Sequence, residues 1–352
     1  MIMIAIIVCT IILSNVNSQI WTLTLTNSHF NLWNCIAVSG SGKYLLAGVY
    51  GGGLFTSNNS ANSWYYYDDN ATNQASWYSV AISDTGRYQL GGSGHGLFLS
   101  SSYGSNGSFS VPSSLSNIST LWSSVTMTAT GQIMAAVLCC GNGGVDGGIY
   151  FSNNYGLVWS QSSSASSLDN WISITSNFIG NYMYAIKRHM NFTASVYTSS
   201  NNGMSWTIST APNSKAFSQV VTCSSGQYVA IASLNDSIFI SNNYGKSWTA
   251  AEGTSNVFWN DIVLDSTGQY YVAVGENSTI FSSYNYGNSF VNNDPTTKIG
   301  DATSISSNRS FGVIFIASSN SGENNTAGMD NYYHYECLIN IYFKAYMNHQ
   351  IG

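Results

Sequence analysis

A short segment of the form Ser-x-Asn-x-Gly, closed by an aromatic residue three positions after the Gly, recurs along this chain and limits the folds open to it. Three copies are complete and end in Trp: Ser152–Trp159, Ser199–Trp206 and Ser241–Trp248. Three more are degenerate: Ser57–Trp64 with Ala61 in the Gly place, Ser283–Phe290, and Ser100–Phe109 with two extra residues after Gly104. Such repetition predicts a chain assembled from repeated structural units.

The spacing of the copies indicates which repeat architecture is present. The Gly-equivalent positions are 61, 104, 156, 203, 245 and 287, which gives separations of 43, 52, 47, 42 and 42 residues. Repeats of about 40–50 residues are typical of β-propeller blades with four strands each. The composition agrees, because 14% aromatic residues, 33 Gly and only 7% charged residues favour strands and tight turns. We therefore predict an all-β propeller with four-stranded blades.

A second pattern precedes each copy: an aromatic residue, alternating apolar residues, and a turn that usually contains Gly. In the first unit, Trp33-Asn-Cys-Ile-Ala-Val is followed by Ser41-Gly42-Lys43, where Gly can take the positive φ of a hairpin. The first blade is therefore expected to have strands at 34–39, 43–49, 53–56 and 63–67.

The ends of the chain decide the number of blades. Residues 301–305 and 310–316 resemble the first two strands of a further unit, so seven blades are expected, with six as the alternative. Residues 19–25 resemble the strand that follows a box, and residues 332–343 are a candidate for the remaining strand. An N-terminal strand that completes the last blade would close the ring and remove unpaired sheet edges. The propeller then spans 19–343, and residues 344–352 form a tail.

These segments and their spacing resemble Asp-box (BNR) repeat propellers over nearly the whole mature chain. Such repeats occur in sialidases, sortilin-type receptor ectodomains, xyloglucan-cleaving glycoside hydrolases and photosystem II assembly factors, so the resemblance implies the fold and leaves the function open. The family's Asp is replaced here by Asn. The resemblance implies that the boxes are structural hairpins away from any catalytic centre. Their residues are Ser57, Asn59, Trp64, Ser152, Asn154, Gly156, Trp159, Ser199, Asn201, Gly203, Trp206, Ser241, Asn243, Gly245, Trp248, Asn285 and Gly287.

The first residues have the pattern of an export signal. Residues 1–13 are almost wholly apolar, and Val16 and Ser18 lie where a signal peptidase prefers small residues. We expect residues 1–18 to be a cleaved signal peptide, which predicts a secreted monomer without a membrane span; the alternative is a buried N-terminal strand. Nine sequons are candidates for glycosylation, at Asn58, Asn70, Asn106, Asn117, Asn191, Asn235, Asn277, Asn308 and Asn324.

Charge argues against several classes of function. A net charge of −6 with nine scattered basic residues provides no surface to neutralise a phosphate backbone, so nucleic-acid binding is not expected. A sialidase-like site needs three converging arginines, but the chain has only Arg87, Arg188 and Arg309, and two of them lie at predicted turns. The histidines are dispersed, so no metal or other cofactor is expected.

A glycoside hydrolase is harder to exclude, because it needs only two carboxylates across a cleft. In our alignment of the inner strands, the third positions are Cys35, Ser79, Ser124, Ser173, Gln219, Asp261 and Asp301. Asp261 and Asp301 would then be neighbouring carboxylates beside the channel. Either they divide acid and base roles, or they hydrogen-bond backbone groups at the channel mouth.

The shortage of catalytic groups favours a secreted, non-catalytic propeller that binds a glycan or an extracellular protein through loops at one end of the channel. The alternative is a secreted, xyloglucanase-like glycoside hydrolase that uses Asp261 and Asp301. The Gly-rich insertion at 141–148, which contains Asp146, is a cation site or a flexible connection. The sequence does not determine the ligand, the disulfide pairing or which sequons are used.

Overall fold

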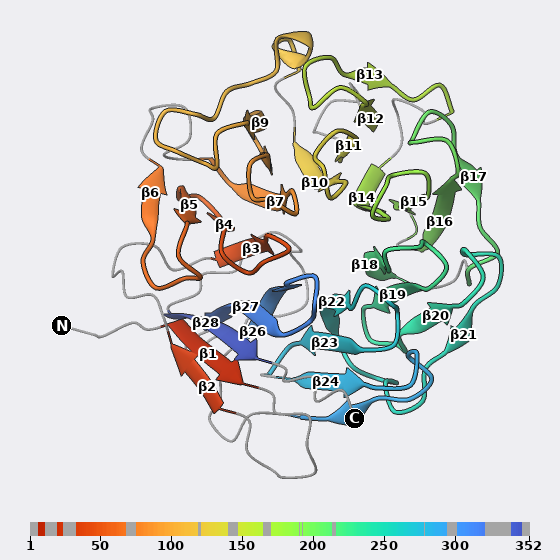
Figure 1. Cartoon of the computed structure of the whole chain (residues 1–352). Coiled ribbons are helices and arrows are strands. Elements are labelled where there is room, and N and C mark those ends of the chain that lie inside the picture. Colours follow the sequence, from red (N-terminus) through yellow and green to blue (C-terminus); the bar gives the residue numbers. More distant parts are fainter. Residues whose placement is uncertain are drawn as a thin grey trace.

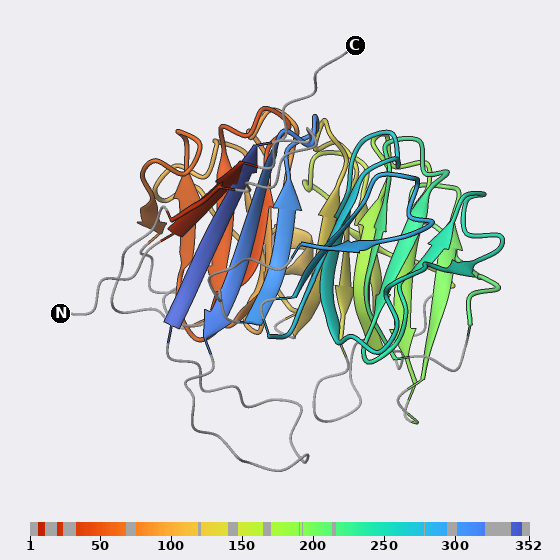
Figure 2. The same ribbon diagram turned by 90° about the horizontal axis from the view of Figure 1, so that it is seen from below.

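The computed structural model consists of β-sheets arranged radially around one axis, with the innermost strands lining the centre (Figures 1 and 2). The structure describes residues 6–10, 20–23, 33–67, 75–118, 121–139, 147–164, 170–189, 191, 193–212, 216–277, 279–293, 301–320 and 339–346. Within these ranges the sole helix is the 3₁₀ turn Ser113–Leu115, and no helix is long and apolar enough to cross a membrane. The all-β propeller predicted from the repeat is confirmed.

Six consecutive sheets carry the repeat, and the strands of each follow one another antiparallel from the inside to the outside. The first three are β3 (Trp33–Val38), β4 (Leu45–Val49), β5 (Leu54–Ser57) and β6 (Tyr65–Tyr67); β7 (Trp77–Ile82), β8 (Gln89–Ser93) and β9 (Gly96–Ser100); and β10 (Trp122–Met127), β11 (Met134–Leu138), β12 (Gly148–Ser152) and β13 (Ser160–Gln161). The next three are β14 (Asn170–Ser176), β15 (Met183–Arg188), β16 (Ala194–Ser199) and β17 (Thr207–Ile208); β18 (Phe217–Thr222), β19 (Val229–Ser233), β20 (Phe239–Ser241) and β21 (Thr249–Ala250); and β22 (Trp259–Leu264), β23 (Tyr271–Gly275), β24 (Ile280–Ser283) and β25 (Val291–Asn292).

The second of these sheets lacks a fourth strand. A single bridge between Leu99 and Ser110 stands in its place. Its box is the one with two extra residues after Gly104, and the longer hairpin leaves too little regular pairing for a strand. In the first sheet, by contrast, the observed strands agree with the predicted ones to within two residues at each end.

The last sheet is built differently. It has five strands in the order β1-β2-β28-β27-β26, where β26 is Asp301–Ser307, β27 is Val313–Asn320, β28 is Ile339–Tyr346, β2 is Ile20–Leu23 and β1 is Ile6–Thr10. β1 runs parallel to β28, and the sheet contains no box. The expectation of seven blades is therefore wrong, and the alternative of six holds: the structure has six blades of the repeat and one sheet of different composition.

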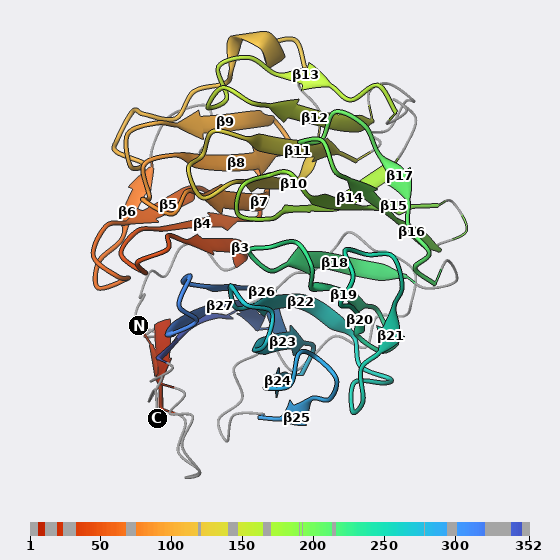
Figure 3. The ribbon, with the colours of Figure 1, turned by 45° about the vertical axis from the view of Figure 1, so that its right-hand side comes forward.

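The ends of the chain differ from the predicted boundaries. β28 continues to Tyr346, so the predicted tail at 344–352 begins three residues too early. β1 lies inside the predicted signal peptide, and β2 lies inside the segment expected to complete the last blade. β26 lies between β3 and β22, so the last sheet stands next to the first (Figure 3).

The core is divided into separate layers, each between two neighbouring sheets. Five inner strands begin with or contain a buried Trp, and β18 has Phe217 in that place. The five tryptophans are Trp33, Trp77, Trp122, Trp171 and Trp259. Trp122 packs with Leu90 and Leu97 of the preceding sheet and with Tyr150 of its own. Because each sheet contacts only its two neighbours, one aromatic residue per repeat is enough to fill each layer.

Side chains also hold neighbouring sheets together at a bulge in each inner strand. The register of each inner strand with its neighbour shifts directly after the aromatic position, and in five of the seven inner strands the side chain of the extra residue donates a hydrogen bond to the next sheet. The donors reach the carbonyl of the next aromatic position at 2.7–2.8 Å in Asn34 to Trp77, Ser123 to Trp171, Ser218 to Trp259 and Asn260 to Ala302. Thr303 makes the same bond to Trp33, from the last sheet to the first, at 2.8 Å.

Candidate functional site: the channel and its mouth

The inner strands enclose a central channel with a cavity of about 520 Å³. The third residues of six inner strands line this cavity, counted from the aromatic position: Cys35, Ser79, Ser124, Gln219, Asp261 and Ser304. Ser79, Ser124 and Ser173 each accept a hydrogen bond from a backbone N–H of the next sheet at 3.1 Å. These hydroxyls therefore link neighbouring sheets around the channel.

Asp261 performs the same linking role in the sixth blade. Its carboxylate accepts hydrogen bonds from the backbone N–H groups of Ile262 and Ile305, both at 2.8 Å. Gln219 Nε2 donates to it at 3.2 Å and Ser304 Oγ at 3.0 Å. Burial raises the pKa of Asp261 to about 6. The hydrogen bonds favour the ionised form and lower the pKa, but burial has the larger effect. All four contacts come from structural groups, so the carboxylate is engaged in the scaffold.

The predicted carboxylate pair does not occur at equivalent positions. Ala302 takes the aromatic position in β26, and the register shift places Ser304, not Asp301, opposite the third positions of the other strands. Asp301 lies three residues earlier, where it pairs with Ser319 of β27. The alignment missed this because the last unit has no aromatic residue to mark the start of its inner strand. The neighbour of Asp261 at this level of the channel is therefore a serine hydroxyl.

One end of the channel is framed by the hairpins that follow the inner strands. Six of the seven residues that start these hairpins donate their backbone N–H to the equivalent carbonyl of the next sheet. These bonds run from Gly40 to Asp84, Asp84 to Ala129, Ala129 to Phe178, Phe178 to Ser224 and Ser224 to Ser266 at 2.8–3.2 Å, and Arg309 donates to Gly40 at 3.3 Å. The seven residues form the rim of a pocket of about 210 Å³, which we call the mouth.

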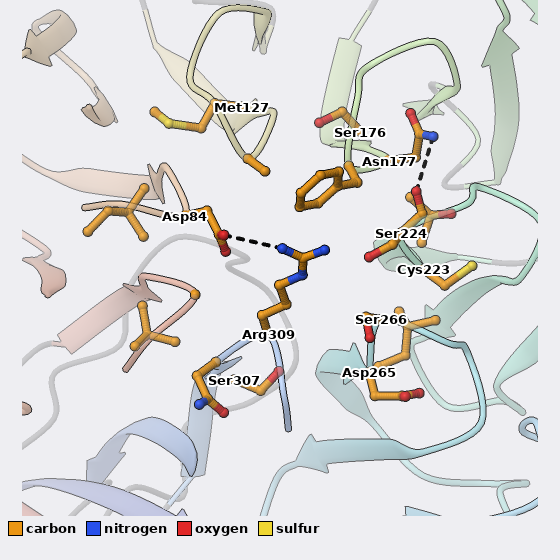
Figure 4. A pocket seen from close by; sticks show the side chains of 18 residues that line it. Asp84, Met127, Ser176, Asn177, Cys223, Ser224, Asp265, Ser266, Ser307 and Arg309 are labelled. Carbon is orange, nitrogen blue, oxygen red and sulfur yellow. Dashed lines mark hydrogen bonds and ion pairs between the residues drawn. The ribbon is translucent and has the colours of Figure 1, made fainter. Parts of the chain in front are cut away.

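Arg309 reaches across this mouth (Figure 4). Its guanidinium lies 3.4 Å from a carboxylate oxygen of Asp84, two rim positions away, and 4.1 Å from the centre of the Phe178 ring. Gly40 makes room for Asp84, because a Cβ there would lie 1.7 Å from its Oδ1. Three different sheets thus converge on one cation. The sequence placed Arg309 correctly on an exposed turn but gave no sign that this turn faces the channel.

Other charges at the mouth are held within their own turns. Asp265 is buried, and its two carboxylate oxygens accept the backbone N–H groups of Thr267, Gln269 and Tyr270 at 2.8–3.1 Å. Apolar side chains of Val38, Ile82, Met127 and Leu264 line the same pocket. The mouth therefore offers one cation beside an aromatic ring, with a few apolar side chains in a mostly polar lining.

The boxes form the hairpins to the outermost strands. In the fifth blade, Asn243 Oδ1 accepts hydrogen bonds from Ser241 Oγ at 3.0 Å and from the backbone N–H of Ser247 at 2.9 Å. These are the bonds that a carboxylate would accept. The amide of Asn243 also donates to Ser247 Oγ at 2.7 Å, which an Asp cannot do. The same three contacts recur around Asn59, Asn201 and Asn285. In each of these boxes the Asn amide donates to the hydroxyl of the serine four residues later, a bond that an Asp carboxylate cannot make.

The box tryptophans are part of the scaffold as well. Trp159, Trp206 and Trp248 donate their indole N–H to the carbonyl of the box glycine at 3.0–3.2 Å. Among the residues that the structure describes, no group of three or more His, Cys, Asp or Glu side chains is placed to hold a metal ion. Asp146 and most of the Gly-rich insertion lie outside the described residues.

The comparisons with known proteins support the fold alone. No protein-family model matches this chain, and a search of curated protein sequences finds no relative. Among solved structures, YCF48 bound to a D1 peptide is 12% identical, with a TM-score of 0.60 over 81% of this chain and 90% of that chain. YCF48 from Cyanidioschyzon merolae is 12% identical, with a TM-score of 0.61 over 81% of this chain and 92% of that one. Hydrazine synthase of Kuenenia stuttgartiensis is 10% identical, with a TM-score of 0.63 over 86% of this chain and 96% of that chain.

Proposed function

We propose that this protein is a secreted, non-catalytic propeller that binds a segment of another protein at the mouth of its channel. The observation that carries the proposal is the placement of Arg309 in the mouth, stacked on Phe178 and paired with Asp84. A guanidinium has five N–H donors, and within the described residues Asp84 is its one carboxylate partner. The remaining donors suit a ligand carboxylate, and the few apolar side chains in a mostly polar lining offer a small contact for a hydrophobic side chain beside it.

Two further observations support this choice. The propeller of YCF48 has been solved with a bound peptide, so a fold of this kind accommodates a protein ligand. The alternative function, a glycoside hydrolase, needs a second carboxylate near Asp261. At the channel wall the residue beside Asp261 is Ser304, which has no carboxylate. Asp261 itself is buried and engaged with four donors.

The ligand site is tested with a library of fluorescent hexapeptides that carry one Asp, Glu or free C-terminal carboxylate beside a hydrophobic residue. Fluorescence anisotropy is expected to find binders among them, and the matching amidated peptides should bind more weakly. Arg309→Gln should weaken the best binder at least tenfold, because a carboxylate loses its charged partner. Asp84→Asn should tighten it severalfold, because the internal competitor for the guanidinium is removed.

Unchanged binding by the Arg309→Gln variant would exclude the mouth as the carboxylate site. Release of reducing ends from xyloglucan by the wild-type protein, lost in an Asp261→Asn variant, would instead favour the hydrolase.

We also propose that the last sheet completes the ring as its closing blade, with β2 as the strand that the N-terminal segment supplies. The hydrogen bonds from Thr303 to Trp33 and from Arg309 to Gly40 join this sheet to the first one and support the proposal. Cleavage after Ser18 would remove β1 and leave β2 beside β28. The secreted protein is proposed to be a monomer.

Export predicts a particular pattern of glycosylation. Six sequon asparagines are exposed in the structure: Asn58, Asn106, Asn117, Asn191, Asn235 and Asn277. Asn308 is buried, and its side chain accepts the N–H of Val313 at 2.9 Å and donates to Ser310 at 3.0 Å. A glycan on Asn308 would break this turn. Asn70 and Asn324 lie outside the described residues.

Peptide mapping of protein secreted from eukaryotic cells, after enzymatic deglycosylation in ¹⁸O water, is expected to find label at several exposed sites and none at Asn308. Full occupancy of Asn308 in folded, secreted protein would contradict the turn seen here. Retention of the whole chain inside the cell, with Met1 intact, would contradict export by cleavage.

A further inference from the structure

Four tyrosines occupy the same strained position in four different boxes. Tyr103, Tyr155, Tyr244 and Tyr286 directly precede the box glycine, and their φ angles lie between 60° and 62°. A left-handed backbone costs a bulky L-residue about 1–3 kcal/mol. The fourth blade has Asn202 at this position, with a φ of 60°, so the hairpin itself does not require an aromatic residue. Asn is among the residues that best tolerate this conformation.

Each of these tyrosines packs against a second tyrosine from the preceding blade, with interplanar angles of 28–38°. The ring centres lie 5.1 Å apart for Tyr44 and Tyr103, 5.1 Å for Tyr88 and Tyr155, 4.7 Å for Tyr182 and Tyr244, and 5.0 Å for Tyr228 and Tyr286. The inner tyrosine of each pair lies against the hairpin glycine of the next blade; a Cβ on Gly86, for example, would lie 2.3 Å from the ring of Tyr44. The box tyrosine, which is the outer member of each pair, thus packs on a fixed inner tyrosine. Three of the four box tyrosines are 38–45% exposed.

At the two box interfaces that lack a pair, both tyrosines are absent; Tyr270 takes the inner position of the sixth blade, next to the sheet that has no box. Where the box has Asn202, the preceding blade has Ile133 in place of the inner tyrosine. Where the first box has Ser60, the residue at the inner position is Val313 of the last sheet. The inner position is defined in each sheet by the same contact, a backbone N–H that donates to the side chain of the residue directly after the inner strand. The pair is therefore a unit that some blade interfaces have and others lack.

Stacking alone does not offset the strain. An aromatic pair contributes about 0.5–1.5 kcal/mol beyond its buried area, which is no more than the left-handed conformation costs. The arrangement gives a flat, partly exposed aromatic face that is held rigid. This face is repeated at four blade interfaces, on the end of the propeller that carries the box hairpins. Backbone strain of this kind occurs preferentially at functional sites.

The surroundings of the four faces point to a neutral, hydroxyl-rich ligand. The box residues beside the tyrosines are Ser and Asn, as in Ser101, Asn153 and Asn242, which are all exposed. Only 7% of the chain is charged, and cations accompany two of the pairs, with Lys43 over Tyr44 and Arg87 over Tyr88. Pyranose rings present apolar C–H faces to aromatic rings and hydroxyls to amides. A surface that repeats by blade also favours a ligand that repeats.

We propose that the four tyrosine pairs are stacking platforms for the sugar rings of a neutral polysaccharide, which binds along the hairpin end of the propeller through several platforms at once. Each platform alone binds weakly. A chain long enough to reach two or more gains effective concentration, so affinity rises with polymer length. This site lies outside the mouth and does not depend on ligand binding at Arg309.

The test uses affinity electrophoresis of the whole protein in gels that contain hydroxyethylcellulose, xyloglucan, laminarin or glycol chitin. At least one polysaccharide should retard the wild-type protein, and short oligosaccharides of the same sugar should compete much less than long ones. Tyr155→Asn and Tyr286→Asn copy the residue that the fourth blade already has, so the hairpins should fold. Each substitution should weaken retardation two- to fivefold, and all four together should reduce it at least tenfold.

Two controls separate binding from a structural role. The double variant Ile133→Tyr/Asn202→Tyr builds a fifth platform and is expected to increase retardation. Arg309→Gln should leave retardation unchanged, which distinguishes this site from the mouth. The proposal is overturned if folded wild-type protein is not retarded in any of the four gels, or if the four-fold Tyr→Asn variant is retarded like the wild type. If the four-fold Tyr→Asn variant melts at a much lower temperature than the wild type, and the wild type is not retarded in any gel, the pairs only hold neighbouring blades together.

Discussion

Replacing Trp122 with Ala is expected to lower the free energy of unfolding by about 3–5 kcal/mol, the range seen when a large buried aromatic residue is truncated. Trp122 is fully buried between the second and third blades, where it contacts Leu90, Leu97 and Tyr150. The neighbouring sheets are fixed by their own hydrogen bonds and cannot close around the vacated space. Urea unfolding followed by circular dichroism measures the loss.

Trp122→Phe is the matched control. The fifth blade has Phe217 at this position, fully buried, so the architecture accepts the smaller ring. The indole N–H of Trp122 is also buried without a hydrogen-bond partner, and Phe removes that unsatisfied donor. We expect Trp122→Phe to lose clearly less stability than Trp122→Ala. Equal losses would mean that the aromatic positions do not act through packing.

Replacing Asp261 with Ala is expected to destabilise the protein by about 2–4 kcal/mol at pH 7. Four donors lose their acceptor, among them the buried N–H groups of Ile262 and Ile305, and each unsatisfied group costs about 1–3 kcal/mol. Removal of a buried charge offsets part of this loss, and water in the polar channel offsets more. A variant as stable as the wild type would show that the carboxylate does not link the blades.

The same carboxyl gives stability a pH dependence of definite sign. Burial raises the pKa of Asp261 from 3.8 to about 6, so between these values the folded protein holds this proton more tightly than the unfolded chain does. Its contribution to the free energy of unfolding therefore falls as pH rises from 4 to 6, by up to about 3 kcal/mol, and stays low above pH 6. Asp261→Asn cannot titrate. Urea unfolding at pH 4.5 and 7 should show a smaller difference for this variant than for the wild type.

The repeat alone predicted much of the fold. Box spacing and the aromatic that begins each inner strand depend on local turns and on packing between neighbours, so they appear in the sequence as a period. The strands of the first blade followed from them to within two residues. The prediction failed at the last sheet, which has no box and has Ala302 in the aromatic position, so its register could not be aligned.

The candidate sites required tertiary structure. Asp261 and Asp301 looked equivalent in the sequence, but Ala302 takes the aromatic position of the last inner strand, and this puts Ser304 beside Asp261. Arg309 was visible as a turn residue, yet its partners Asp84 and Phe178 come from sheets more than 100 residues away in the chain. The sequence by itself determined the repeating unit, because each unit is stabilised by contacts within itself and with its neighbours. Only the radial arrangement of the sheets decided which side chains meet at the mouth, because those contacts depend on the rotation from one sheet to the next and leave no period in the sequence.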